Sequence, residues 1–274
     1  WSSAFTSARI IVMDASPLLA LSLRYLISGL IGVGIALALG QSWRLTPAQW
    51  RATIIFGVLQ NAVYLGLNFI AMQTIEASLA AIIASTMPLL VGFAAWAFLG
   101  EKLRPLGIAG LFAGVIGVAI IMGARLGGQV DLYGLILCAI GVVALTAATL
   151  LVRGATSGGN FLMVVGLQML VGCVALSIAT LLFETPRIDP SLRLTLAFAY
   201  TCLVPGLAAT VVWFWLVNRI GATRAATFHF LNPFFGVAIA ALLLGETLGP
   251  RDILGVAIIA GGILAVQVSR QRKA

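Results

Sequence analysis

The third apolar segment of the chain, which we place at residues 48–72, carries polar side chains at helical spacing. Asn61, Tyr64 and Asn68 stand at positions i, i+3 and i+7, so an α-helix would put them on one face. Polar groups inside a membrane are expensive, and they usually face a cavity or another helix. Two interpretations stay open. The three side chains form one wall of a ligand cavity, or the two asparagines join helices through hydrogen bonds of about 0.6 kcal/mol each.

The one histidine of the chain belongs to a second polar cluster, next to a proline. Pro233 lacks a backbone donor, which predicts a kinked helix with a carbonyl group freed about one turn earlier, near His229. Asn232 or Pro233 shares a helical face with His229. His229 either packs as a neutral hydrogen-bonding residue or binds the carboxylate or aromatic ring of a ligand. Pro88 predicts the equivalent kink in an earlier segment, and helices kinked in this way are suited to gating.

Two further polar residues, Arg24 and Gln168, lie at similar places in two other apolar segments. The Arg24 cation could anchor a carboxylate, or it could reach a helix end or the membrane surface. All eight acidic residues fall at segment ends, which leaves His229 as the group at membrane depth that titrates near neutral pH. We therefore expect weak or no obligatory proton coupling.

The cysteines give no sign of a metal site or a catalytic centre. Cys138, Cys173 and Cys202 all lie inside apolar runs, without CxxC spacing and without a nearby histidine. We interpret them as packing residues. The sequence predicts no catalytic residue, no metal and no cofactor.

The elements that hold these side chains are predicted to be membrane-spanning helices. Of the 274 residues, 61% are apolar and 9% are charged, and the mean hydropathy is +1.12, whereas about a quarter of a soluble protein is charged. Backbone amides in a bilayer must be satisfied within the protein, and the apolar runs show no strand-like alternation. We predict an all-α polytopic membrane protein with ten transmembrane helices. They are placed at residues 1–13, 17–39, 48–72, 76–99, 105–124, 132–153, 160–183, 192–218, 222–244 and 250–269.

The charged residues predict how the chain is oriented. The net charge is +8, but the basic residues stand singly at segment ends and form no patch for nucleic acid. With the N-terminus in the cytoplasm, the inner side receives ten basic residues and one acid, and the outer side receives four basic residues and seven acids. The positive-inside rule then places both termini in the cytoplasm, with residues 270–274 as a basic tail.

The chain contains an internal repeat. Shifted by 145 residues, the first half matches the second without a gap, and the phrase Gly-Glu-x-Leu-x-Pro occurs at Gly100 and again at Gly245. We expect two units, residues 1–124 with a truncated first helix and residues 132–269. Each unit holds five segments, an odd number, so the second crosses the membrane in the opposite sense. Inverted repeats are typical of carriers that alternate between two open states around a midplane site.

The repeat also predicts what faces the polar stripe. The equivalents of Asn61, Tyr64 and Asn68 in the second half are Gly206, Ala209 and Trp213. The two small residues would leave room opposite the polar wall, and Trp213 would face Asn68.

The duplicated loops, the opening Trp1-Ser-Ser-Ala-Phe and the stretch from Ser16-Pro-Leu-Leu to Arg24-Tyr resemble the ten-helix, EamA-type exporters of the drug/metabolite transporter superfamily. The resemblance covers almost the whole chain. Within the superfamily the sequence is most similar to bacterial exporters of aromatic amino acids of the YddG type. The resemblance implies a transporter and not an enzyme. It would export amino acids, aromatic or otherwise apolar, or related metabolites across a bacterial-type inner membrane, by alternating access around a central cavity. Members usually have several more residues before the tryptophan, so the first helix is short here.

Three other classes stay open beside a carrier. A channel would need a continuous polar stripe, which no segment shows over its full length. A membrane assembly protein without transport is the second. An intramembrane serine hydrolase would need a nucleophile and a base on facing helices, but the phrase Ser157-Gly158 falls in a predicted loop.

Glycine spacing bears on the oligomeric state. Small residues recur every three to four positions in the fifth and tenth segments, at Gly110, Gly114, Gly117, Ala257 and Gly261. Such spacing suits tight helix contact. We expect it to pack the last two helices of each half against each other, with a homodimer interface as the alternative. The expected form is a monomer or a weak homodimer, with the lipid bilayer and a small-molecule substrate as its partners.

Overall fold

The computed structural model describes residues 1–102, 104–125, 131–152, 158–220 and 228–271, and within these ranges the elements are helices. The extended contact found there is an isolated antiparallel bridge between Ala15 and Ile188. Seven of the described helices are long and apolar enough to cross a membrane, and two shorter apolar helices accompany them. The all-α membrane fold is therefore confirmed.

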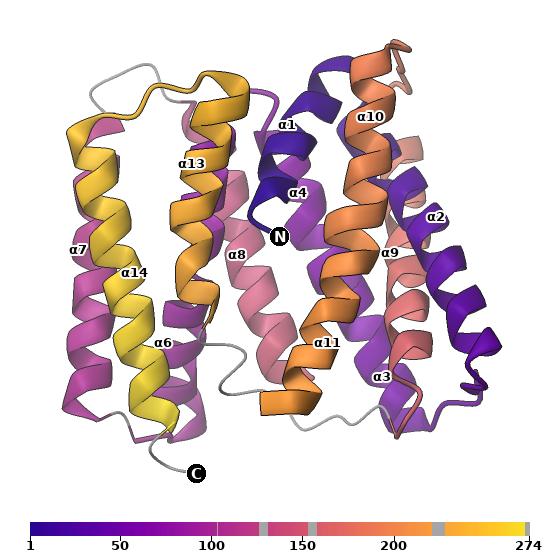
Figure 1. Cartoon of the computed structure of the whole chain (residues 1–274), viewed down its shortest axis with the longest axis horizontal. Coiled ribbons are helices and arrows are strands. Elements are labelled where there is room, and N and C mark those ends of the chain that lie inside the picture. The colour runs from indigo at the N-terminus through magenta and orange to yellow at the C-terminus, as the bar shows by residue number, and fades with distance from the viewer. Residues whose placement is uncertain (103, 126–130, 153–157, 221–227, 272–274) are drawn as a thin grey trace.

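Within the described ranges the helices follow the predicted segments (Figure 1). The first half contains α1 Ser3–Asp14, α2 Pro17–Ala38, α3 Pro47–Phe56, η1 Gly57–Tyr64, α4 Leu65–Ala71, α5 Ala77–Ser85, α6 Met87–Leu99 and α7 Pro105–Arg125. The second half contains α8 Leu132–Leu151, α9 Phe161–Phe183, α10 Leu192–Thr201, η2 Cys202–Ala208, α11 Ala209–Ile220, η3 Phe228–Leu231, α13 Asn232–Leu244 and α14 Pro250–Gln271. Three features of the sequence lie outside the described residues: Ser157, the start of the ninth segment up to residue 227, and the last three residues of the tail.

Two spans contain a π-helical stretch at equivalent places. In the third segment η1 joins α3 to α4, and in the eighth η2 joins α10 to α11. The stretches begin at Gly57 and Cys202, which are 145 residues apart as the repeat requires. Pro205 lies inside η2, where it cannot donate to the carbonyl one turn back and so favours a wider turn. A π-helical stretch changes which residues face a given direction, and this affects the site described below.

The two predicted kinks lie where helices break. Pro88 is the second residue of α6, which follows α5 after Thr86, and Pro233 is the second residue of α13, which follows the 3₁₀ turn η3. Proline is tolerated in the first turn of a helix because the backbone donors there have no partner within the helix. In both halves the break therefore falls directly before the proline.

Two glycines of α7, Gly110 and Gly117, pack against α14, whereas Gly114 packs against Leu89 of α6, the preceding helix of the same half. A Cβ atom on Gly110 would lie 2.7 Å from the carbonyl oxygen of Gly262, and one on Gly117 would lie 2.8 Å from that of Gly255. The pairing is antiparallel, and Figure 1 shows the two helices side by side at one edge of the bundle. The expectation that these glycines join the last two helices of each half holds for Gly114 but was wrong for Gly110 and Gly117, because spacing identifies a packing face but not its partner. On α14 the packing face carries Gly255 and Gly262, whereas Gly261 has open space beside it.

Side-chain acceptors link the two halves at helix N-termini. The Glu246 carboxylate accepts the backbone N–H groups of Ala77 and Ser78, at 2.8 and 2.9 Å. This residue, expected at the membrane surface after α13, thus caps α5 of the other half. The Glu184 carboxylate likewise accepts the N–H groups of Leu18 and Leu19 at the start of α2. Uncompensated N–H groups and the helix dipole both favour a carboxylate at such a place.

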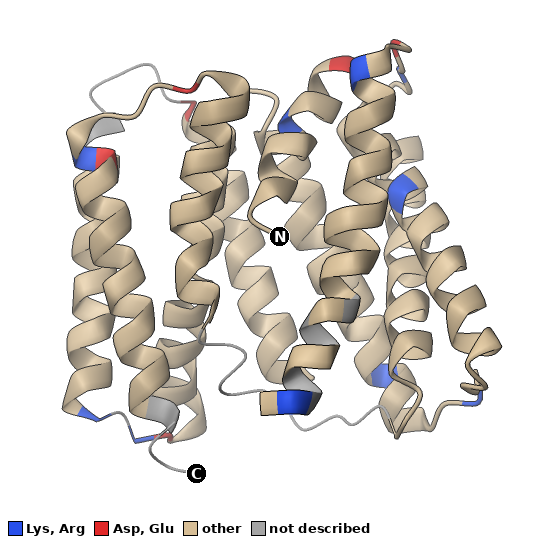
Figure 2. Ribbon diagram, viewed as in Figure 1, with Lys and Arg blue, Asp and Glu red and all other residues tan. Residues whose placement is uncertain are grey.

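The charged residues gather at the two ends of the bundle, and the middle is almost free of them (Figure 2). The end where the C-terminus lies is mostly basic, and most of the acidic residues are at the other end. The first helix begins about midway along the bundle and rises to the acidic end (Figure 1). A long apolar middle between two charged ends is the arrangement that a bilayer requires.

Candidate substrate cavity

A cavity of ≈ 590 Å³ occupies the middle of the bundle. It is lined by both halves and reaches Val152 and Phe161, where α8 ends and α9 begins. Seven of the residues singled out in the sequence lie on its wall: Arg24, Asn61, Tyr64, Pro88, Gln168, His229 and Asn232. Residues more than 200 positions apart in the chain thus meet around one space.

Arg24 provides the charge in this wall. Its side chain is 7% exposed, and its Nε atom has no hydrogen-bond partner. The guanidinium carbon lies 5.3 Å from the centre of the Tyr25 ring, a cation–π contact. Gly206 of η2 also lies beside the guanidinium group, and a Cβ added to it would be 3.9 Å from Nη2 of Arg24. The sequence left open whether Arg24 faces a cavity or reaches a helix end or the membrane surface, and in the structure its side chain lines the cavity. Because Gly206 has no side chain, there is room beside the guanidinium group.

Asn61 both joins helices and lines the cavity. Its Nδ2 donates to the backbone carbonyl of Gln168 on α9 at 2.9 Å, and the residue is 4% exposed. The helices approach closely because α9 has a glycine here: a Cβ on Gly172 would lie 2.5 Å from that of Asn61. The same contact brings Gln168 to the cavity wall.

Asn68, in contrast, does not line the cavity. It is 1% exposed, its Nδ2 donates to the Tyr64 carbonyl at 2.8 Å, and its Oδ1 faces the Cys138 thiol of α8 at 3.4 Å. The expected stripe assumed α-helical turns, but η1 takes more residues per turn. The cavity face therefore continues from Asn61 through Leu65 to Phe69, and Asn68 turns toward α8. The side chain of Trp213, its predicted neighbour, lies outside the described residues.

The polar cluster around His229 is held by the first residues of the chain. The Trp1 ring stacks on the His229 ring at 5.6 Å and 10°, and its indole N–H donates to the Pro205 carbonyl at 3.0 Å. Asn232 donates to Nδ1 of His229 at 2.9 Å and accepts from the Ser2 hydroxyl at 3.2 Å. Sequence reasoning did not expect Trp1 and Ser2 in the cavity wall. The sequence feature that could have indicated this position is the presence of polar groups, the indole N–H of Trp1 and the hydroxyl of Ser2, at the start of an apolar segment.

Most of the remaining wall is apolar or aromatic. Sequence reasoning did not place these side chains at the cavity, among them Phe5, Tyr25, Phe56, Phe69, Met72, Met87, Phe161 and Met169. Pockets of this kind, mainly apolar with a few placed polar groups, bind small organic molecules. The arrangement suits a ligand with one anionic group and an apolar body.

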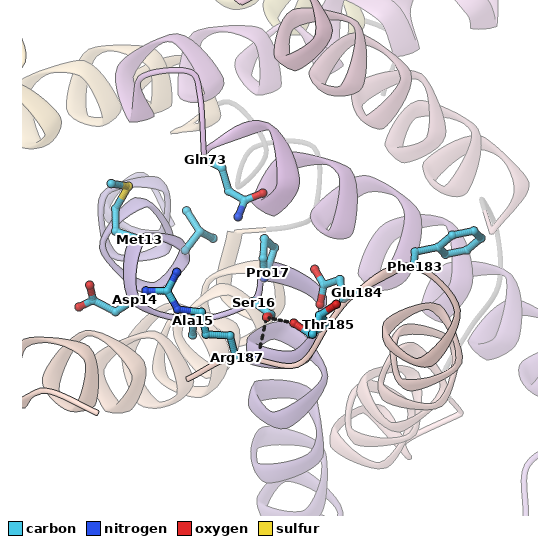
Figure 3. A pocket seen from close by; sticks show the side chains of 11 residues that line it. Met13, Asp14, Ala15, Ser16, Pro17, Gln73, Phe183, Glu184, Thr185 and Arg187 are labelled. Atoms are coloured by element: carbon cyan, nitrogen blue, oxygen red, sulfur yellow. Dashed lines mark hydrogen bonds between the residues drawn. The ribbon is translucent and has the colours of Figure 1, made fainter. Parts of the chain in front are cut away.

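A second, smaller pocket of ≈ 320 Å³ lies at the end of the bundle away from the C-terminus, between the α1–α2 turn and the segment after α9 (Figure 1 and Figure 3). Its polar groups bind one another. The Ser16 hydroxyl donates to the Thr185 carbonyl at 3.0 Å and accepts the Arg187 N–H at 2.8 Å. The Arg187 side chain hydrogen-bonds Asp189 and holds the pKa of that exposed carboxyl below its usual value. This pocket therefore marks a contact between the two halves.

Comparison with known proteins agrees with this architecture. The model of the EamA-like transporter family matches residues 1–123 and again residues 132–267. The uncharacterized transporter YvbV of Bacillus subtilis (strain 168) is 26% identical over 279 aligned residues, which cover 100% of this chain and 90% of the relative. YoaV of the same organism, also an uncharacterized transporter, is 24% identical over 96% of this chain and 91% of its own length.

Two more matches are partial or distant. The aromatic amino acid exporter YddG of Ancylobacter novellus is 30% identical over 112 residues, which are 41% of this chain and 39% of the relative. A solved crystal structure has a TM-score of 0.71 at 21% identity and covers 99% of this chain and 94% of the other. At that identity the likeness shows the fold. The family match, by contrast, covers both halves of the sequence, and this chain belongs to the EamA-like transporter family, whose members are multi-pass membrane transporters and not enzymes.

Proposed function

We propose that this transporter exports apolar amino acids, aromatic ones in particular, from the cytoplasm. The observation that carries the proposal is Arg24, a buried cation with an unpartnered Nε in the wall of an otherwise apolar and aromatic cavity. A carboxylate is the group that a guanidinium binds best. The aromatic wall suits an apolar side chain, and the partial match to an aromatic amino acid exporter supports the same class of substrate.

The direction of transport rests on the distribution of charge. The basic end of the bundle, where the C-terminus lies, is the cytoplasmic end by the positive-inside rule (Figure 2). The cavity reaches residues near that end through Val152 and Phe161. At the acidic end, Glu184 and Glu246 hold the N-termini of α2 and α5. This structure would then be the state that takes up substrate from the cytoplasm.

Alternating access would follow from the repeat. In this proposal residues 1–124 and 132–269 are two units that exchange their roles when the cavity changes sides. The helix breaks before Pro88 and Pro233 serve as the gating hinges, because they interrupt equivalent spans and Pro88 borders the cavity.

Counterflow in proteoliposomes tests the proposal. Vesicles preloaded with an unlabelled amino acid should take up labelled phenylalanine faster than empty vesicles, and the uptake should saturate. Arg24→Gln, which keeps most of the side chain but removes the charge, should reduce uptake at least about tenfold. Arg44→Gln, at an exposed position outside the cavity, is the matched control and should retain full uptake.

Two results would contradict the proposal. Absence of counterflow across aromatic, branched-chain and small amino acids, with protein that is folded and inserted, would exclude the substrate class. Uptake that does not saturate would indicate a channel instead of a carrier.

A further inference from the structure

The charged residues of the cavity wall are all of one sign, positive. Among the described residues that line the cavity, Arg24 is the one lysine, arginine, aspartate or glutamate, and His229 is never negative. All eight acidic residues of the chain lie within the described ranges, and none of them lines the cavity. The segments outside those ranges contain no acidic residue. The cavity therefore carries a positive charge that the protein does not neutralise.

The acidic residues are also held elsewhere. Glu184 and Glu246 cap α2 and α5, as described above, and Asp131 accepts backbone N–H groups at the start of α8. Asp252 accepts the Gly249 N–H at 3.0 Å. Any of these four carboxylates could reach Arg24 only by giving up its position at a helix end.

A buried cation without a counter-ion is costly, and at bilayer depth water compensates it poorly. A carboxylate brought by the substrate would satisfy the Nε of Arg24 and supply the missing charge. Gly206 keeps the space beside the guanidinium open for it. Binding at this point is therefore favoured by the charge of the substrate and not only by its shape.

The ammonium group of an amino acid finds no comparable partner. The oxygen acceptors around the cavity are neutral, and several of them already accept a hydrogen bond. The Pro205 carbonyl accepts from Trp1, the Gln168 carbonyl from Asn61, and Oδ1 of Asn232 from Ser2. Moving a cation from water to neutral acceptors beside another cation is unfavourable.

We propose that the carboxylate alone secures the substrate, so that the site takes the anion of an apolar carboxylic acid at least as well as the corresponding zwitterionic amino acid. The inference rests on the proposed function and names the feature of the substrate that is recognised. It has a consequence for energetics. An inside-negative membrane potential favours the exit of an anion but does not act on the net charge of a zwitterion.

Three molecules with the same phenylethyl skeleton separate the contributions of the two charged groups. Phenylalanine carries both, 3-phenylpropionate carries the carboxylate, and 2-phenylethylamine carries the ammonium. In competition against counterflow of labelled phenylalanine, 3-phenylpropionate should inhibit at the same or a lower concentration than unlabelled phenylalanine. The amine should require at least about tenfold more. Arg24→Lys should keep this order, Arg24→Gln should abolish it in a direct binding measurement, and Arg44→Gln should leave it unchanged.

The outcomes distinguish the inference from the proposed function. If phenylalanine is transported but 3-phenylpropionate competes about tenfold less well, or the amine competes equally, the inference is wrong and the function stands. If labelled 3-phenylpropionate is transported and phenylalanine is not, amino-acid export is wrong and carboxylate recognition stands. In the second case, a valinomycin-imposed potassium potential, negative inside, should accelerate the exit of 3-phenylpropionate.

Discussion

The contact between α7 and α14 and the wall of the central cavity are both built from repeat-related helices, but the two halves of the sequence match in the first and differ in the second. At the α7–α14 contact, Gly110 and Gly117 of one half stand where Gly255 and Gly262 stand in the other. Each of the four glycines has a backbone oxygen of the opposite helix within 2.8 Å of where its Cβ would be. We call this contact the glycine seam.

At the cavity the backbones correspond but the side chains do not. The stretches η1 and η2 are π-helical at equivalent positions. Where η1 presents Asn61, however, η2 has Gly206, next to Pro205. The seam thus uses the symmetry of the repeat to close the bundle, and the cavity departs from that symmetry to create one polar wall. Positions where the halves agree should affect stability, and positions where they disagree should affect transport.

The largest effect should come from filling the glycine seam. A Cβ on Gly262 would lie 2.6 Å from the Gly110 carbonyl oxygen and 2.9 Å from the Gly114 nitrogen, and backbone atoms cannot rotate away. Gly262→Leu should therefore force α7 and α14 apart and cost about 3 kcal/mol or more of stability. Thermal unfolding of the purified protein in detergent measures this loss.

The adjacent residue provides the control. Gly261 has no atom within 4 Å of an added Cβ, so Gly261→Leu should change the stability by less than about 0.5 kcal/mol. Both variants add the same side chain to the same helix and differ only in the face that carries it. Equal melting temperatures for the two would show that the seam is not a close contact.

A smaller effect, and one on transport, should separate two asparagines of the same span. Asn61 and Asn68 are both buried, and the Nδ2 of each donates to a backbone carbonyl. Only Asn61 lines the cavity. Asn61→Ala should raise the KM of transport about three- to tenfold, because a polar contact to the substrate is lost. Asn68→Ala should cost about 1 kcal/mol of stability and leave KM within about twofold. A raised KM for Asn68→Ala with an unchanged KM for Asn61→Ala would show that Asn68, and not Asn61, contacts the substrate.

The same two asparagines show how far the sequence could predict the site. Hydropathy located the helices closely, as for the seventh segment, expected at 160–183 and observed at Phe161–Phe183. A period of 3.6 residues then placed Asn68 on the cavity face, which it leaves because η1 is π-helical. Pro205 could have indicated the matching stretch η2, but η1 contains no proline. A single sequence gives no local reason to widen that turn.

Contacts between distant segments were the other feature that the sequence did not predict. The glycines of α7 indicated a tight contact but not that α14 supplies most of it, and Glu246 was expected at a segment end but not as a cap on α5. Periodicity describes one helix at a time, whereas a partner depends on how all the helices are arranged. The sequence did not predict the contact between Trp1 and His229 for the same reason, since it joins the first and the ninth segments of the chain.

The smallest effect should come from two helix caps that occur in both halves, as the seam does, but are made by different residues, as the cavity wall is. Glu184 caps α2 with a carboxylate, and Gln41 caps the repeat-equivalent helix α9 with an amide oxygen, which accepts the Met163 N–H at 3.0 Å. The two halves therefore use the same contact with different charge. Glu184→Gln keeps one of the two acceptor oxygens and loses the charge beside the helix dipole together with the bond to the second N–H group, so it should cost about 0.5–1 kcal/mol at low salt.

Comparison with Glu184→Ala isolates the hydrogen bond that glutamine can still accept. The alanine variant removes the acceptor as well and should cost about 1–2 kcal/mol, as the loss of a helix cap does. The difference between the two variants then measures the remaining hydrogen bond, and the charge-dependent part of the loss in Glu184→Gln should shrink as salt screens the helix end. If glutamine proves as harmful as alanine, the amide at Gln41 is not a working equivalent of the carboxylate. The caps would then belong with the cavity, as a place where the halves differ for a functional reason.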